Sequence, residues 1–382
     1  MSERPVVSIA RCATYEPAAL SAALEKSLRP LGGMQAFVRP GQSVFLKVNL
    51  LSKAEPERMV TTHPELVRAV VRAVKAAGGE VSLGDSPGGK TSAAAAAKLF
   101  EVTGMAEVAA SEGANLVLLD DEHVRVAVPH KAKYASLTLG GAAVKADVLI
   151  TLPKFKTHGF MTLTGAVKNQ FGLVPGLEKA QFHLKVPSRP DFADMLIDIN
   201  EACMPALAIM DAVVGMEGEG PAGGSPKPIG ALLASANVYA LDVVMAAMAG
   251  LAVGEAPVTK QAAMRGLGPL SVEDVEVAGV GWREVAPAEY LLPQRDLSSR
   301  LSPAMAEHAK GLVTAKPFLA QPDRCTSCAT CAQNCPAEAI TMKGGKPTFD
   351  YGECIRCYCC QELCPPQAIG LKRNWLVRAL VG

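Results

Sequence analysis

Two cysteine runs near the end of the chain restrict its fold more than any other feature. Nine of the eleven cysteines lie between Cys325 and Cys364, and eight of these form two copies of Cys-x2-Cys-x2-Cys-x3-Cys-Pro. Each residue of the second run follows its counterpart by 29 positions, as 354 − 325 gives for the first pair. The N-terminal residues predict no export signal, so such clustering indicates metal ligation rather than disulfide bonds. We therefore expect an internal duplication in which each half gives a strand pair and a short helix.

The two runs resemble bacterial ferredoxins that hold two [4Fe–4S] clusters, over about Lys316 to Leu371. In those proteins the first three cysteines of a run bind one cluster and the fourth binds the other. The resemblance implies Cys325, Cys328, Cys331 and Cys364 for the first cluster, and Cys354, Cys357, Cys360 and Cys335 for the second. Cys359 breaks the spacing and is expected not to be a ligand. Zinc is the alternative, but two four-cysteine runs with trailing prolines are a poor zinc pattern.

The rest of the chain predicts an α/β fold, with a large domain of mainly parallel sheet flanked by helices and a small α+β ferredoxin-like domain. We expect the large domain at 1–285, a linker at 286–316, the cluster-binding domain at 317–371 and a basic tail at 372–382. The expected strands are Val6–Ala10, Ser43–Val48, Glu80–Leu83, Asn115–Leu119, Val148–Leu152, Ala206–Met210 and Gly230–Ala234. The expected helices include Glu65–Ala77, Ser92–Ala110, Asp191–Ala202 and, in the linker, Ala304–Leu312.

Polar residues gather after several of these strands, where open α/β sheets bind ligands. They lie in Lys47–Asn49, in the loop from Gly84 to Thr91, in Pro153–His158, in Lys168–Gly172 and in Gly215–Pro221. Together these segments resemble the domain-of-unknown-function family 362, over about Val44 to Gly268. Members of that family often carry a ferredoxin module, and the family supplies no settled reaction. The site must therefore be inferred from residue chemistry.

Lysines and histidines crowd one of these segments. Lys154, Lys156, His158 and Lys168 lie just past a strand end, and a helix is expected to follow near Leu163. Its N-terminal amides and the ammonium groups suit a small anion such as a carboxylate or phosphate. His158 and His183 are the expected proton donors, with Lys168, because imidazole titrates near neutrality. The expected substrate-binding residues are Lys47, Asn49, Asp85, Ser86, Lys154, Lys156, Asn169, Asp211, Glu217 and Glu219. Singly, each is as easily explained as a solvated or hydrogen-bonded residue.

Two further patterns leave alternatives open. The loop Gly84–Thr91 fits the nucleotide-binding pattern G-x-x-x-x-G-K-T, with Lys90 as its lysine, and Asp120 ends a strand as a magnesium ligand would. Asp85 within that loop would repel a phosphate. Asp211, Glu217 and Glu219 either bind a divalent cation through oxygen or are solvated carboxylates, which we rank slightly ahead. A flavin has no universal signature and stays open as a cofactor.

Composition limits the partners. Net charge is +1, charged residues make up 20% and aromatic residues 5%, which argues against a nucleic-acid surface. No apolar run approaches a membrane span, so we predict a cytoplasmic protein without stable membrane insertion. The leading hypothesis is an oxidoreductase that passes single electrons from two [4Fe–4S] clusters to a small anionic substrate, with a redox partner protein as a further expected partner. The alternatives are an electron-transfer subunit for a partner protein and a nucleotide-dependent maturation or activating factor.

Overall fold

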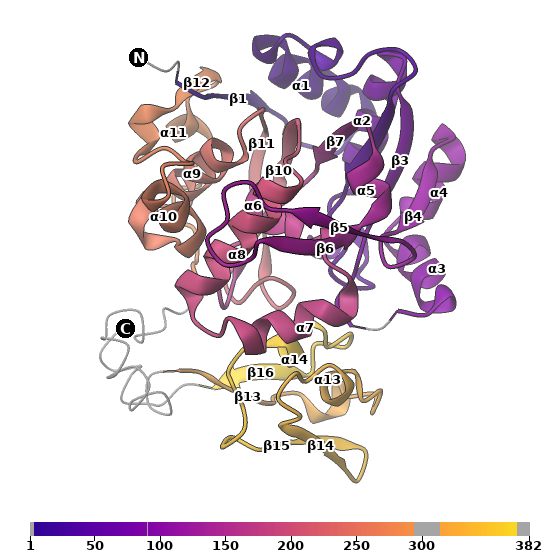
Figure 1. Cartoon of the computed structure of the whole chain (residues 1–382), viewed down its shortest axis with the longest axis vertical. Coiled ribbons are helices and arrows are strands. Elements are labelled where there is room, and N and C mark those ends of the chain that lie inside the picture. The colour runs from indigo at the N-terminus through magenta and orange to yellow at the C-terminus, as the bar shows by residue number, and fades with distance from the viewer. Residues whose placement is uncertain (1–3, 90, 294–313, 373–382) are drawn as a thin grey trace.

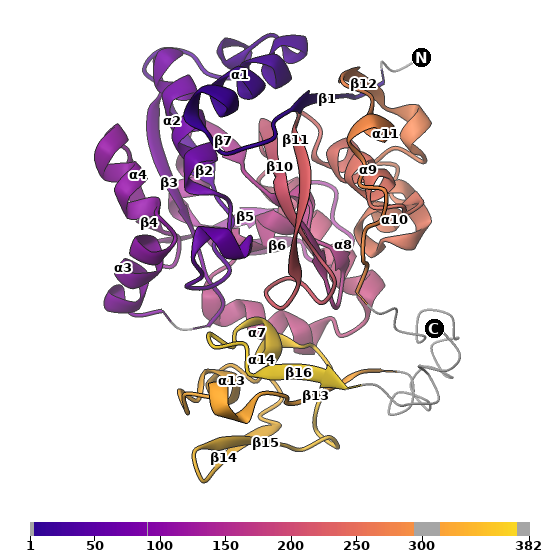
Figure 2. The same ribbon diagram turned by 180° about the vertical axis from the view of Figure 1, so that it is seen from behind.

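The computed structural model describes residues 4–89, 91–293 and 314–372. Lys90, the expected helix Ala304–Leu312 and all but the first residue of the expected tail lie outside these ranges. In the described part of the chain, no helix is long and apolar enough to cross a membrane. Figures 1 and 2 show a large α/β body with a small module, drawn in orange and yellow, against one end of it.

A ten-stranded sheet forms the centre of the large body, in the order β12-β1-β11-β10-β7-β2-β3-β4, with β8 and β9 branching from β10. Its strands are β1 (Val6–Arg11), β2 (Ser43–Lys47), β3 (Glu80–Asp85), β4 (Asn115–Leu118), β7 (Val148–Thr151), β8 (Lys154–His158), β9 (Thr162–Leu163), β10 (Leu207–Glu217), β11 (Ser225–Ser235) and β12 (Glu276–Gly279). A separate hairpin pairs β5 (His123–Ala127) with β6 (Ser136–Gly140). Neighbours pair in parallel except where β11 meets β1 and β10, and where β9 meets β8. The sheet is therefore mainly parallel, as predicted.

Helices cover both faces of this sheet. They are α1 (Pro17–Leu28), α2 (Pro64–Ala76), α3 (Ala93–Val102), α4 (Met105–Glu112), α5 (Gly141–Lys145), α6 (Ala166–Asn169), α7 (Gly176–Lys185), α8 (Arg189–Ala202), α9 (Val238–Met248), α10 (Pro257–Met264) and α11 (Trp282–Val285). Strand β2 shows the two layers, because Val44 and Leu46 pack in the core beneath α1 to α4 while Phe45 points into the core beneath α8 and α9. Alternate residues of a strand point to opposite faces, so a sheet covered on both sides needs continuous apolar strands.

Local sequence signals explain most element ends. Helix α2 begins with Pro64 after His63, whose Nδ1 accepts a hydrogen bond from the Glu65 amide at 3.2 Å. The single helix expected over Ser92–Ala110 is instead two, α3 and α4, because Gly104 adopts a left-handed conformation with φ of 76°. A left-handed residue cannot continue an α-helix, and glycine adopts it without steric cost.

The small module contains β13 (Lys316–Leu319), α13 (Thr330–Gln333), β14 (Ile340–Lys343), β15 (Lys346–Phe349), α14 (Cys359–Glu362) and β16 (Ile369–Lys372). Each half supplies one short helix, as the duplication predicts. The strands pair differently from a simple pair per half: β13 pairs with β16, at opposite ends of the module, and β14 pairs with β15. In both views α14 faces α7 of the large body, and the β14–β15 hairpin lies farthest away (Figures 1 and 2).

Candidate functional site

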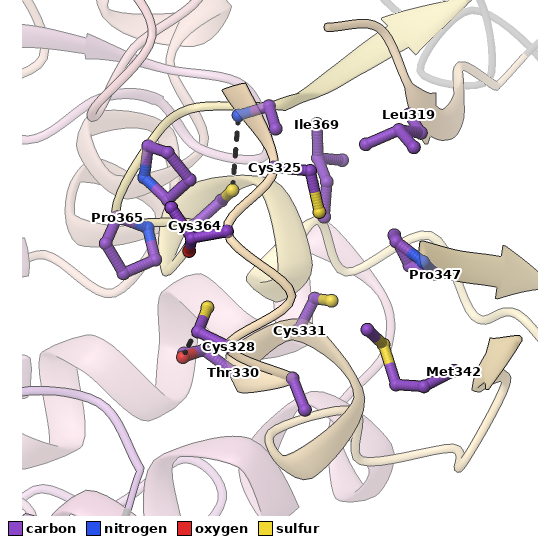
Figure 3. Close-up of a pocket in the computed structure, with 14 residues that line it drawn as sticks. Leu319, Cys325, Cys328, Thr330, Cys331, Met342, Pro347, Cys364, Pro365 and Ile369 are labelled. Atoms are coloured by element: carbon purple, nitrogen blue, oxygen red, sulfur yellow. Dashed lines mark hydrogen bonds between the residues drawn. The ribbon is translucent and has the colours of Figure 1, made fainter. Parts of the chain in front are cut away.

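The eight run cysteines surround two separate cavities in the module. One, of about 310 Å³ counted to its opening, is lined by Cys325, Cys328, Cys331 and Cys364 (Figure 3). The other, of about 320 Å³, is lined by Cys335, Cys354, Cys357 and Cys360, with Cys359 at its edge. The fourth cysteine of each run thus faces the cavity of the other run. We call these the first and second cysteine cavities.

The backbone around the two cavities repeats with the sequence. Left-handed residues recur 29 positions apart, at Ser327 and Arg356 and at Ala329 and Tyr358, with φ between 58° and 65°. The fourth cysteine of each run accepts a backbone hydrogen bond four residues later, at 3.3 Å for Cys335 Sγ and 3.2 Å for Cys364 Sγ. Amides directed at sulfur stabilise thiolate charge and influence the potential of a cluster that the sulfur binds.

These cavities fit a group larger than a single ion. Among the described residues, no three His, Cys, Asp or Glu side chains are placed to hold one metal ion. Four cysteines around each cavity instead match the donor set that a cubane cluster requires. The thiols line the cavities together with apolar residues such as Ile340 and Ile369, which limits access of water. The donor chemistry therefore fits iron–sulfur clusters better than zinc.

A third and larger cavity, which we call the junction cleft, opens between the module and the large body. It holds about 730 Å³ of empty space, counted to its opening. The large body contributes Asn49, Leu50, Leu51, Asp85, Ser86, Pro87, Gly88, Gly89, Lys168, Asn169, Phe171, Gly172, Lys179, Ala180 and His183, and the module contributes Asn334, Cys359, Glu362 and Leu363. Asn334 precedes Cys335 of the second cysteine cavity, and Cys359 lines that cavity itself. Leu363 precedes Cys364 of the first, so the module side of the cleft borders mainly the second cysteine cavity.

Lys168 is the cleft residue best placed for an anion. Its Nζ forms no hydrogen bond or ion pair with any residue that the structure describes, and it lies 5.7 Å from the centre of the Phe171 ring. Burial lowers the pKa of Lys168, and the nearby Glu362 carboxyl opposes that shift. An ammonium group that has lost water without gaining a close partner is stabilised by an anion entering the cleft.

Lys179 lines the same cleft from α7. Its Nζ donates to the Ser86 carbonyl at 2.6 Å, to Ser86 Oγ at 2.7 Å and to the Val174 carbonyl at 2.6 Å. Burial lowers its pKa to about 7, although the carboxylates of Asp85 and Asp120 oppose that shift. Lys179 is therefore a cleft group that titrates near neutrality.

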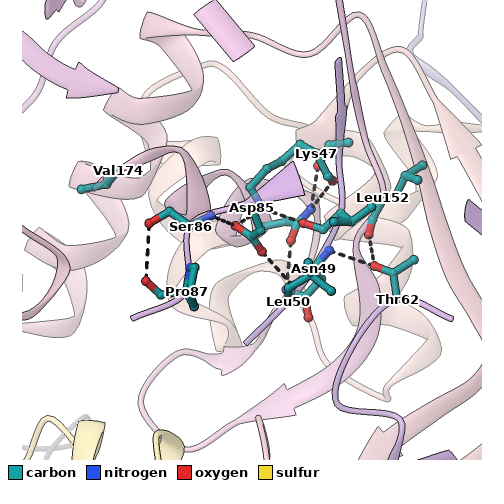
Figure 4. Close-up of polar contacts among 12 residues, drawn as sticks. Lys47, Asn49, Leu50, Thr62, Asp85, Ser86, Pro87, Leu152 and Val174 are labelled. Carbon is teal, nitrogen blue, oxygen red and sulfur yellow. Dashed lines mark hydrogen bonds and ion pairs between the residues drawn. The ribbon is translucent and has the colours of Figure 1, made fainter. Parts of the chain in front are cut away.

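Buried polar contacts fix the floor of the cleft beside β2 and β3 (Figure 4). Lys47 Nζ forms an ion pair with Asp85 Oδ1 at 2.8 Å, and Asp85 also accepts hydrogen bonds from the Leu50 and Ser86 amides. Asn49 Nδ2 donates to Asn169 Oδ1 at 2.9 Å. Of the expected substrate-binding residues, Asn49, Asp85, Ser86 and Asn169 line the cleft, whereas Lys47 lies behind it as the partner of Asp85.

Two expected lysines point elsewhere. Lys154 Nζ contacts Asp211 Oδ2 and the Tyr15 hydroxyl, each at 2.8 Å, and neither Lys154 nor Asp211 lines the cleft. Lys156 Nζ donates to Asn49 Oδ1 and to the Val60 carbonyl, each at 2.7 Å, and burial lowers its pKa to about 7. These lysines belong to strand β8 itself rather than to a loop after a strand. Their ammonium groups already have partners and support the site from behind.

The histidines differ in position. His183 lines the cleft and stacks on Phe192 with ring centres 4.6 Å apart, whereas His158 lies beneath it with Nε2 3.2 Å from Glu362 Oε1. Burial lowers the pKa of His183 to about 3 and that of His158 well below its usual range. Both rings are therefore neutral at pH 7. The expectation of an imidazolium proton donor is wrong for this environment, because burial and neighbouring lysines disfavour the charged ring.

The expected anion site at a helix N-terminus is also filled. The helix that follows Leu163 is the short α6, and its Ala166 and Val167 amides donate to the two carboxylate oxygens of Asp242 at 2.5 and 3.1 Å. A side chain of the protein thus takes the place that we expected for a ligand. Burial raises the pKa of Asp242 to about 7.

The loop after β3 uses its amides to hold the cleft together. The Ser86 amide donates to the Gly172 carbonyl at 3.3 Å, and the Gly89 amide to the Gly176 carbonyl at 3.1 Å. Asp120 Oδ1 accepts from Ser86 Oγ and from the Gly176 amide. A Cβ at Gly88 would lie 2.9 Å from Leu363 Cδ2, so the loop also packs closely on the module. These amides are not directed at a common phosphate position, which removes support from the nucleotide interpretation.

The acidic loop after β10 makes contacts with protein groups. Glu217 Oε2 lies 3.3 Å from Lys227 Nζ and accepts from the Leu291 amide at 2.9 Å, and the Glu219 carbonyl accepts from Gln361 Nε2 at 3.4 Å. Asp211 is separately paired with Lys154, so the three carboxylates do not form one cation site. Glu217 thus contacts the linker at Leu291, and Glu219 contacts α14 at Gln361. Neither residue lines the junction cleft.

Sequence reasoning missed Lys179 and Glu362. Lys179 lies four residues before His183 on α7, so both face the cleft, and this spacing was a signal in the sequence. Glu362 is buried, and burial raises its pKa while Lys168 and Lys156 oppose that shift. Nothing local in the sequence predicts its approach to His158, because the two residues are far apart along the chain.

Comparisons with known proteins agree with the two-part structure. Residues 44–247 match the family model "Domain of unknown function (DUF362)", and residues 318–365 match the "4Fe-4S dicluster domain" model. The thylakoid-associated protein sll1697 of Synechocystis is 37% identical over 275 residues, which cover 70% of this chain and 81% of that protein.

Among solved structures, the lactate racemase apoprotein of Thermoanaerobacterium thermosaccharolyticum aligns with a TM-score of 0.41 and 15% identity. The alignment covers 65% of this chain and 58% of that one, so this chain spans less than two thirds of its length. The extent of the family match decides the grouping: this chain belongs to the DUF362 family and carries a C-terminal iron–sulfur module of the 4Fe-4S dicluster type.

Proposed function

We propose that this protein is an iron–sulfur oxidoreductase in which a small anionic substrate binds in the junction cleft. The observation that carries the proposal is the composition of that cleft. One side presents Lys168 and Lys179, and the other presents Cys359 and Asn334, which adjoin ligands proposed for the second cluster. The clusters, when bound, exchange electrons one at a time. A substrate in this cleft would lie directly beside such an electron source.

Residues that line the cleft bind the substrate, supply a proton and exclude water. Lys168 offers an ammonium group that has no hydrogen bond or ion pair to any described residue, and this group binds and orients the anion. Lys179, with a pKa of about 7, supplies a proton as charge develops on the substrate, by exchanging its hydrogen bond to Ser86 Oγ, which also lines the cleft, for one to the substrate. Neutral His183 offers a hydrogen-bonding group at the cleft wall, and Asn169 holds that wall in place through its hydrogen bonds to Lys47 and Thr151. Leu363 and Phe171 cover apolar parts of the substrate and exclude water.

We propose two [4Fe–4S] clusters per chain, held by the cysteines of the first and second cavities as given above. We also propose the division into a large domain of about 1–285, a connecting segment and a module of 317–371. The hydrogen bond from the Leu291 amide to Glu217 moves the end of the large domain a few residues beyond 285. Flavin and divalent cation receive no support from a residue in the cleft and are not part of the proposal.

A reoxidation experiment on the anaerobically purified protein tests whether the junction cleft is the substrate site. Dithionite-reduced protein is freed of excess dithionite and mixed with a panel of small anions that carry a reducible group, such as keto or unsaturated carboxylates and their phosphate esters, and reoxidation is followed by visible absorbance. Lys168→Met should lose most of the reoxidation by the responsive anion, whereas Lys26→Met, on an exposed face of α1, should not change it. Equal rates in both variants would rule out the cleft as the substrate site.

The second candidate function is that of an electron-transfer subunit for a partner protein. The observation in its favour is that the large body packs closely on the module, at Gly88 and Leu363 and at Glu219 and Gln361. In that case no small anion should accelerate reoxidation, and variants of the cleft should have no effect. Mass spectrometry of small molecules retained by the reduced protein separates the two functions, because only the oxidoreductase should retain an anion that Lys168→Met releases.

A further inference from the structure

The two proposed clusters differ in their exposure to solvent. The loop of the first cysteine cavity, Thr326–Cys328, is exposed at all three positions. The equivalent residues of the second run, 29 positions later, are half-buried at Ile355 and Cys357 and buried at Arg356. The next residue of the second loop, Tyr358, is buried in the same apolar core as the helices α8 and α9. The large body therefore covers the second loop and leaves the first one open.

Basic residues surround the open loop. Arg324 and Lys343 are exposed, and the half-buried Lys346 Nζ donates to the Pro322 carbonyl at 2.7 Å and to the Cys325 carbonyl at 3.0 Å. The β14–β15 turn lies beside the loop, since a Cβ at Gly345 would be 3.0 Å from Ser327 Oγ. Asp323 is the one acidic residue in this group. We call Asp323, Arg324, Thr326–Cys328, Lys343 and Lys346 the carrier rim.

The solvent side of the second cavity has the opposite charge. Glu338 and Glu353 are exposed and adjoin the lining residues Ala337 and Cys354, and the exposed Asp350 accepts a backbone hydrogen bond from the Cys354 amide. The half-buried Lys316, next to the lining residue Pro317, offsets one of these three negative charges. The module thus presents a net positive surface at the first cavity and a cluster of acidic residues outside the second. A charged partner is steered to the rim or away from it by this distribution.

We propose that the carrier rim is the docking surface for a small acidic protein that carries single electrons, and that electrons pass between it and the first cluster. The inference rests on the proposed function, because it assigns the junction cleft to the substrate and the opposite face to the partner. Electron tunnelling falls steeply with distance, so a carrier must approach an exposed cluster closely. The Thr326–Cys328 loop carries small uncharged side chains, which permit that approach, while the flanking cations provide attraction.

The test measures binding between oxidised proteins, so it requires neither substrate nor turnover. The probe is an oxidised plant-type [2Fe–2S] ferredoxin, which is small and acidic, titrated into the cluster-loaded protein by calorimetry at an ionic strength of about 0.1 M, where charges are screened over about 10 Å. The double variant Arg324→Glu/Lys343→Glu should weaken binding by about tenfold, and about 0.5 M salt should remove most of the difference. Lys26→Glu, a single reversal on exposed α1 at the far end of the molecule, should change binding little (Figure 1).

A second variant distinguishes the two faces of the module. Glu353→Lys makes the surface outside the second cavity more basic without touching the rim. If the carrier docks on the rim, Glu353→Lys should leave the dissociation constant within about twofold, as rim-remote charges do. Tighter binding by Glu353→Lys, or weakening by Lys26→Glu equal to that of the double variant, would overturn the proposal. Iron and sulfide content confirms that each variant keeps its clusters, and loss of substrate-dependent reoxidation alone would concern the cleft rather than the rim.

Discussion

The two halves of the cysteine module have the same backbone and opposite surroundings. Both halves repeat the cysteine spacing and the left-handed residues at Ser327/Arg356 and Ala329/Tyr358. In both, a backbone amide donates a hydrogen bond to the sulfur of the fourth cysteine. Outside the ligand positions the side chains diverge, from Ala329 in the first half to the buried Tyr358 in the second. The cluster chemistry therefore fixes the backbone of a duplicated motif, and the intervening residues decide which half docks on the large body.

Because of this divergence, the two halves of the module have different neighbours. The helix α14, from the second half, supplies Cys359 and Glu362 to the junction cleft, and Gln361 contacts the Glu219 carbonyl. The corresponding helix α13 supplies only the residue that follows it, Asn334. The proposals above therefore assign electron exchange with the cleft to one half, and with a docked carrier protein to the other.

The largest expected effect separates neighbouring cysteines of the second half. Cys360→Ser should lose or convert one cluster, so iron should fall from about eight per chain toward about four. Cys359→Ser should keep both clusters, because Thr330 occupies the equivalent position of the first half and the spacing of the run excludes Cys359. Iron analysis and electron paramagnetic resonance of the reduced variants measure this. Loss of a cluster from the Cys359 variant alone would mean that the ligand register of the second half is different.

A smaller effect concerns the contact that covers the second half. Tyr358→Ala removes an aromatic side chain from the core shared with the large body, which should cost about 3 kcal/mol at that contact. The reciprocal variant Ala329→Tyr adds a ring at the equivalent, half-buried position of the open half, which the large body does not cover, and should destabilise the protein less. Thermal unfolding and hydrogen exchange of α14 compare the two variants. Equal destabilisation by both would indicate that the halves are equally engaged by the large body.

The sequence predicts the features that the two halves of the module share, but it does not predict how their surroundings differ. Cysteine spacing and the alternation of strands and helices are local signals, so the module and the mainly parallel sheet follow from them. Six expected site residues of the large body do meet in one cleft, namely Asn49, Asp85, Ser86, Lys168, Asn169 and His183. They lie near the ends of β2 and β3 or in the segment from α6 to α7, and the rule that ligands bind near strand ends located several of them.

The features that the sequence does not predict depend on contacts between residues that lie far apart along the chain. Glu362 reaches His158 only because α14 docks beside β8, and a four-residue helix has no periodicity that predicts its partner. The filling of the α6 N-terminus by Asp242 is a similar case. The low pKa of His183 also depends on burial, which sequence position does not show.

The smallest expected effect tests whether the cleft face, unlike the rim face, moves protons with electrons. Burial lowers the pKa of Lys179 to about 7, so its ammonium form dominates below pH 7 and is lost as pH rises above it. If that ammonium supplies the proton, reoxidation by the responsive small anion should fall by about tenfold per pH unit above 7. Lys179→Arg keeps the charge but does not titrate in this range, so its profile should be flat. Reduction by the carrier, which does not involve Lys179, provides the comparison in the same samples. A parallel decline in both half-reactions, or an unchanged profile in Lys179→Arg, would assign the titration to another group and remove Lys179 as the proton source.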